Sequence, residues 1–84
     1  MIEVFITNIM EVYQAENTIK ELSDCFLDLE ITYDMDETGL HFPCGHTVIR
    51  IKSFKNRKIQ SENIIGMVNK MGYKCQIMPE SICA

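Results

Sequence analysis

Long apolar runs are missing from this sequence. No hydrophobic stretch among its 84 residues approaches the about 18 to 20 residues that a membrane-spanning helix requires. Glu3 interrupts the apolar N-terminus, which argues against a secretory leader. Hydrophobic residues make up 46% and charged residues 24% of the chain, so the composition is that of a globular protein rather than a disordered one. We therefore expect one cytoplasmic domain, residues 1–84, with no membrane contact.

Basic side chains are scarce in the first half of the chain. Residues 1–42 contain ten acidic side chains and one basic side chain, Lys20, whereas residues 43–84 contain seven basic and two acidic side chains. The net charge of −4 disfavours indiscriminate attraction to nucleic acid. Five of the basic residues form one run: Arg50, Lys52, Lys55, Arg57 and Lys58. Either the two halves interleave and their charges cancel, or this run docks a partner.

Two helices and four strands are predicted from the spacing of apolar residues. Alternating residues predict strands near 2–7, 29–34, 46–52 and 73–78, and helical spacing predicts helices near 8–24 and 61–71. Asn8 with Glu11 resembles a capping box, and Ser61 is a suitable N-cap for the second helix. Gly72 is expected to end that helix in a left-handed conformation. Residues 35–45 are expected to form a long hairpin loop.

This order of elements, βαββαβ, predicts an α+β fold of the ferredoxin-like kind. Two helices must cover the same face of one four-stranded antiparallel sheet, because the chain offers no other apolar surface for them. Right-handed crossovers give the strand order 4-1-3-2. In the first strand we expect Ile2, Val4 and Ile6 to be buried and Phe5 to lie on the open face. The loop after this strand, the hairpin loop and the turn at Gly72 are expected at one end of the sheet.

Two segments of the chain read ENTIKEL at residues 16–22 and NIIGMVNKMGYKCQIM at residues 63–78. These segments resemble the heavy-metal-associated domain family, the soft-metal modules of copper chaperones and P-type metal ATPases. The family's binding loop, GMxCxxC, holds a soft ion such as Cu(I) between two thiolates. Met10 stands at the methionine position, but Val12 and Ala15 stand at the two cysteine positions, and neither can donate a lone pair. The resemblance therefore implies the scaffold of the family without its metal site.

Relocated metal ligands are one alternative. The expected hairpin loop contains His41, Cys44 and His46 in the segment HFPCGH, and thiolate plus imidazole suits Cu(I) or Zn(II). The spacing is not a recognised zinc signature, and three donors are present. The other interpretation is that His46 lies on the outward face of a strand, His41 is solvated and Cys44 is a turn residue.

The remaining cysteines and methionines are interpreted structurally. All four cysteines, at positions 25, 44, 75 and 83, are expected to be thiols in the absence of a secretory signal. Cys75 is expected to be a small buried side chain and Cys25 a packing residue between helix and strand. Met10 and Met71 are expected to fill the core.

A protein partner is the other candidate for a ligand. Phe5 and Val48 are predicted at the centre of the open sheet face, and with Arg57 and Lys58 they form the predicted partner surface. Pairing through an edge strand would make a homodimer. Nucleic acid is not expected, because this face has one aromatic residue and the chain has no RNP1 pattern. An enzyme is not expected, because the loop NIMEV lacks a phosphate cradle and no catalytic pair is suggested by spacing.

Two functions thus remain open from the sequence. The first is a protein-binding or regulatory module that kept the heavy-metal-associated scaffold and lost the cysteine pair. The second is a soft-metal carrier for Cu(I) or Zn(II) that uses His41, Cys44 and His46.

Overall fold

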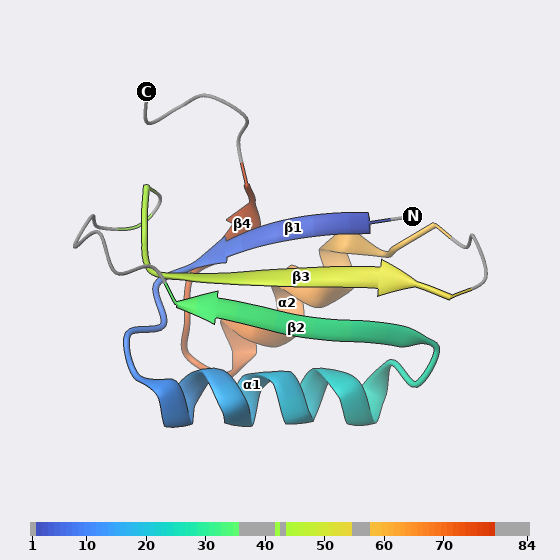
Figure 1. Ribbon diagram of the computed structural model, residues 1–84, viewed down its shortest axis with the longest axis horizontal. Helices are drawn as coiled ribbons and strands as arrows, with labels where there is room; N and C mark the ends of the chain where they lie inside the picture. The colour runs from blue at the N-terminus through green and yellow to red at the C-terminus, as the bar shows by residue number, and fades with distance from the viewer. Residues whose placement is uncertain (1, 36–41, 43, 55–57, 79–84) are drawn as a thin grey trace.

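A four-stranded antiparallel sheet carries two helices on one face (Figure 1). The computed structural model describes residues 2–35, 42, 44–54 and 58–78. In chain order the elements are β1 (Ile2–Thr7), α1 (Val12–Cys25), β2 (Leu29–Met35), β3 (Thr47–Ser53), α2 (Ser61–Lys70) and β4 (Cys75–Ile77). The sheet order is β2-β3-β1-β4, which is 4-1-3-2 when read from the β4 edge. The predicted α+β class with two helices and four antiparallel strands is confirmed.

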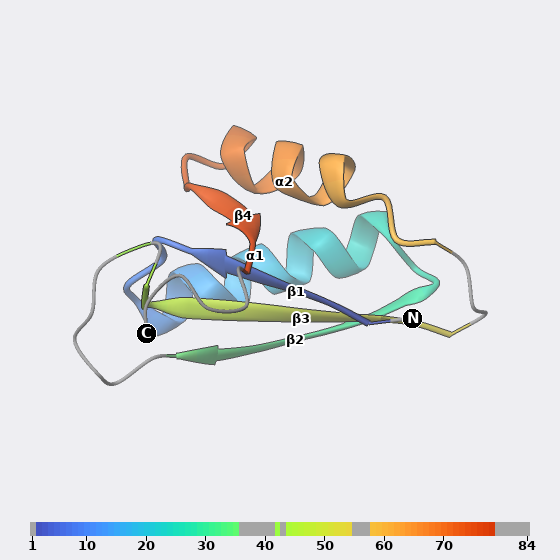
Figure 2. The same cartoon turned by 90° about the horizontal axis from the view of Figure 1, so that it is seen from above.

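The core lies between the sheet and the two helices (Figure 2). Ile49 and Ile51 of β3 are fully buried, as their alternation predicted. Ile64 and Val68 of α2 are buried because they stand one helical turn apart on the same side. α1 packs mainly over β2, and α2 packs over β4. Leu22 of α1 completes the core.

The predicted orientation of β1 is wrong. Phe5 has an exposed fraction of 0%, while Ile2 is exposed and Val4 is half-buried. The register explains this, because Phe5 stands opposite Ile49, and residues opposite each other in a ladder share a face. Phe5 therefore faces the helices. Alternation alone could not decide the orientation, since both faces of this strand carry apolar residues.

The ends of the helices differ in part from the expected caps. No side-chain hydrogen bond caps α1, whose N-cap residue is Glu11, or α2, whose N-cap residue is Gln60 rather than Ser61. The end of α2 follows the prediction. Gly72 has φ +101°, its N–H donates to the Asn69 carbonyl at 3.0 Å, and the Tyr73 N–H donates to the Val68 carbonyl at 3.2 Å. These two bonds form a Schellman motif, which turns the chain sharply into β4.

The sheet face away from the helices carries charged side chains on β2 and β3. Arg50 of β3 forms an ion pair with Asp34 of β2, and Lys52 stands directly opposite Glu30. Ile6 also belongs to this face, yet its exposed fraction is 1%. The helices in the described part of the chain include none that is long and apolar enough to span a membrane.

Candidate functional site

Three segments meet at one end of the sheet, which we call the loop end. They are the β1–α1 connection, the residues just before β3, and the turn between α2 and β4 (Figure 1). A shallow hollow of about 260 Å³ at this end is lined by one set of side chains from all three segments: Asn8, Met10, Phe42, His46 and Lys74. The expectation that these loops share one end is therefore met by the described residues.

Two buried threonines hold the β1–α1 connection against β3. The Thr7 hydroxyl donates to the Thr47 carbonyl at 2.9 Å and accepts the Ile9 N–H at 3.3 Å. The Thr47 hydroxyl donates to the Ile9 carbonyl at 2.8 Å. Thr7, Thr47 and Ile9 all have exposed fractions of 0%, so these bonds satisfy polar groups that water cannot reach. The connection is consequently a rigid part of the domain.

Asn8 ties the same connection to the start of β4. Its N–H donates to the Lys74 carbonyl at 3.2 Å, and the Lys74 N–H donates to Asn8 Oδ1 at 2.8 Å. The predicted capping box fails for this reason, because the Asn8 side chain binds across the fold rather than to the first turn of α1. The pairing extends the contact between β1 and β4, which is otherwise only three residue pairs long.

Three exposed side chains lie in the β1–α1 connection and the first turn of α1. Met10, Val12 and Tyr13 have exposed fractions of 61%, 53% and 63%. Ala15, one turn into α1, is buried at 1%. Met10 is therefore not the core residue that we expected. Val12 and Ala15 both lie in the first turn of α1.

The predicted metal ligands are only partly described. His41 lies outside the described residues, and His46 is half-buried at the edge of the hollow with φ +102°, a conformation that costs a non-glycine residue about 1 kcal/mol or more. Cys44 is disulfide-bonded, so the expectation of four thiols is wrong for this residue. A disulfide sulfur is not the thiolate that soft metals prefer. Within residues 2–35, 42, 44–54 and 58–78, no three His, Cys, Asp or Glu side chains form a group that could hold a metal ion.

The predicted partner surface is not assembled as expected. Phe5 cannot belong to it, because it is fully buried beneath the helices. Val48 is half-buried and lines a hollow of about 280 Å³ with Ile6, Cys44 and other residues on the open face. Lys58 is exposed, and Arg57 lies outside the described residues. Among the described members of the set, Val48 and Lys58 therefore remain half-buried or exposed.

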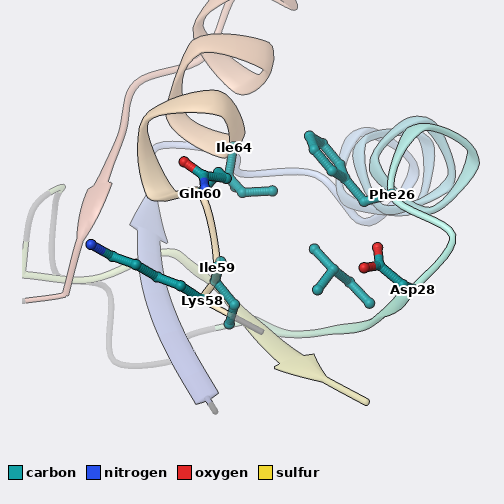
Figure 3. A pocket seen from close by; sticks show the side chains of 7 residues that line it. Phe26, Asp28, Lys58, Ile59, Gln60 and Ile64 are labelled. Carbon is teal, nitrogen blue, oxygen red and sulfur yellow. The ribbon is translucent and has the colours of Figure 1, made fainter. Parts of the chain in front are cut away.

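A separate apolar pocket lies at the opposite end of the domain, between the α1–β2 connection and the start of α2. Its volume is about 210 Å³, below the about 300 to 1,000 Å³ of usual small-molecule sites. In Figure 3 the side chain of Ile64 extends toward the ring of Phe26, Ile59 lies below them in the view, Asp28 lies to one side, and Lys58 extends away. The arrangement offers an apolar contact with one carboxylate at its margin.

Two free cysteines differ in reactivity. Cys75 is buried as predicted, and burial raises the pKa of its thiol to about 12, which keeps it protonated and inert. Cys25 at the end of α1 is exposed, not the packing residue that we expected. It lines an open groove of about 770 Å³ between the helices, together with Lys20, Met67 and other residues.

Comparisons with known proteins give no relative. No family model matches the chain, and neither a curated protein nor a solved structure does so. Sequence reasoning missed Thr7 and Thr47, which looked like ordinary strand residues. Their pairing as residues opposite each other in β1 and β3 could be recognised only once the register was known.

Proposed function

We propose that this protein is a ferredoxin-like domain, similar to heavy-metal-associated domains, that has lost the metal-binding cysteine pair and binds another protein through its loop end. The observation that carries the proposal is the exposure of Met10, Val12 and Tyr13. Met10 lies in the β1–α1 connection, which hydrogen bonds hold to β3 and β4, and Val12 and Tyr13 begin α1 directly after it. The proposed role is noncatalytic.

Physical considerations favour contact with a protein at this position. Exposed methionine and tyrosine side chains are enriched at protein interfaces, where they bury a large apolar area. A preorganised loop loses little conformational entropy on binding. The Thr7 and Thr47 hydrogen bonds and the Asn8–Lys74 pair supply that preorganisation. Val12, where the family has a cysteine, adds apolar surface instead of a metal ligand.

Charge substitutions at the two ends of α1 test the proposal. A protein enriched from a cell extract by the immobilised domain would be purified, and its affinity measured by calorimetry. We expect Tyr13→Glu to weaken binding at least about tenfold, since hot-spot aromatics contribute about 2 kcal/mol or more. Leu27→Glu, a matched control at an 84% exposed residue beyond the other end of α1, should leave binding unchanged. Equal affinities of the two variants would refute the proposed surface.

The soft-metal alternative requires that Cys44 be a free thiol. Cys44 would have to be reduced before it could bind Cu(I) or Zn(II) with His41 and His46. Anaerobic titration of reduced protein against a competing chelator tests this. A carrier requires a dissociation constant well below micromolar, and Cys44→Ser should raise it. Weak binding that is unaffected by this substitution would remove the alternative.

A further inference from the structure

β2 is a seven-residue strand at the edge of the sheet that the described residues form. β2 is the first strand of the order β2-β3-β1-β4, and Figure 2 shows it at the margin of the sheet. Every residue from Leu29 to Met35 is in register with β3, so the strand is extended along its whole length. In the described part of the chain, no strand pairs with its other side. The backbone groups that point outward can therefore accept an added strand.

α1 fixes this strand from the helix side. The Tyr33 hydroxyl donates to Glu16 Oε1 at 3.4 Å, and Ile31 and Leu29 pack into the core. Loss of hydration raises the pKa of the Tyr33 hydroxyl, and the Glu16 charge and hydrogen bond raise it further. The edge is thus held extended before any partner arrives, which lowers the entropic cost of pairing.

Two exposed side chains of β2 carry the charge opposite to that of the neighbouring side chains on β3. β3 presents the cations Arg50 and Lys52, and β2 presents the carboxylates Asp34 and Glu30 beside them. Asp34 forms an ion pair with Arg50, Glu30 stands opposite Lys52 in the ladder, and both acidic residues are exposed to solvent. Opposite charges on neighbouring strands stabilise a ladder, so a third strand on this edge is best accommodated if it is basic.

A second copy of the chain is a poor occupant of this edge. Antiparallel self-pairing centred on Thr32 would place Glu30 of each copy opposite Asp34 of the other, giving two like-charge pairs. Like charges directly opposite each other destabilise a sheet. The carboxylates therefore act against pairing of two identical β2 edges and in favour of a cationic strand.

We propose that the outer edge of β2 binds an extended segment of another protein that carries Lys or Arg at every second residue, by antiparallel strand addition. The inference goes beyond the loop-end binding proposed above and does not depend on it. It names the chemistry of a partner segment and assigns it to a surface separate from the loop end.

A synthetic peptide of alternating lysine and valine, matched in length to β2, is the direct probe. Its affinity would be measured by fluorescence anisotropy, and protection of the β2 amides by hydrogen exchange. We expect Glu30→Gln combined with Asp34→Asn to weaken binding about 2- to 30-fold, as expected for two cross-strand charge pairs. The matched control, Glu21→Gln with Glu62→Gln, removes the same charge from exposed helical positions and should leave the affinity unchanged.

Backbone pairing is tested with the same peptide methylated at its backbone nitrogens. This peptide keeps the charges but cannot donate ladder hydrogen bonds, so we expect it to lose binding and β2 protection. Equal binding of both peptides, equal effects of the two double variants, or no binding of the parent peptide would overturn the inference. Self-association of the protein that disappears in the β2 variant would overturn it as well, because a second copy would then occupy the edge.

The loop-end proposal can be judged separately from this one. Tyr13→Glu should leave peptide affinity unchanged. If the domain does not bind the peptide but still binds a purified partner in a Tyr13-dependent way, the β2 inference alone is overturned.

Discussion

Thr7→Val tests whether the buried threonine network organises the loop end. Valine keeps the shape of threonine and removes its hydroxyl. The Ile9 N–H would then lack its acceptor, and the Thr47 carbonyl would lose the hydroxyl that donates to it at 2.9 Å. A buried polar group left unsatisfied costs about 1 to 3 kcal/mol, and the added methyl regains about 0.8 kcal/mol. We expect a net loss of about 1 to 4 kcal/mol in the free energy of unfolding.

Thr18→Val is the matched control. Thr18 is as fully buried as Thr7, and its hydroxyl donates to the Gln14 carbonyl at 2.8 Å. The Gln14 carbonyl lies one turn earlier in α1, and in an α-helix it also accepts the backbone N–H of Thr18. The carbonyl therefore keeps a partner when the hydroxyl is removed. We expect a change within about 0.5 kcal/mol.

Urea unfolding followed by circular dichroism measures both variants. The expected loss for Thr7→Val is a large part of the total stability of a domain of this size, about 4 to 13 kcal/mol. Hydrogen exchange should also show faster exchange of the Ile9 amide. Equal stabilities of Thr7→Val and Thr18→Val would refute the reasoning, because burial and shape are matched and only the backbone groups left without a hydrogen-bond partner differ.

Three further predictions concern glycine and cysteine. Gly72→Ala should destabilise the protein by about 1 to 2 kcal/mol because of its φ of +101°, whereas Gly66→Ala within α2 should stabilise it by about 0.5 to 1 kcal/mol. Neither added Cβ meets an atom within 4 Å, so the two substitutions differ only in backbone conformation. Denaturant midpoints that shift in the same direction would contradict this argument. The free energy of unfolding should fall as pH rises from 9.0 toward about 12, because burial raises the pKa of Cys75 and the unfolded chain then releases its proton first; this part of the pH dependence should vanish in Cys75→Ala. A thiol reagent should modify Cys25 quickly in the native protein but should modify Cys44 only after reduction, because Cys44 is disulfide-bonded; labelling of Cys44 in denaturant before reduction would contradict that bond.

The sequence by itself determined the elements and the class of the fold. Alternation placed Ile49 and Ile51 in the core, helical spacing did the same for Ile64 and Val68, and Gly72 marked the end of α2. These signals are local, because each depends on the period of one element or on the conformational freedom of one residue. The absence of sulfur at positions 12 and 15 was likewise readable from the sequence alone.

Only the tertiary structure decided which face of β1 is buried and how the loop end is held. Phe5 is buried because its partner in β3 is Ile49, and Thr7 can bond Thr47 because the two residues stand opposite each other. Asn8 binds Lys74 across 66 positions of sequence instead of capping the adjacent helix. Such pairings depend on strand register, which is set by the packing of the whole sheet, and a local pattern of residue types carries no information about it.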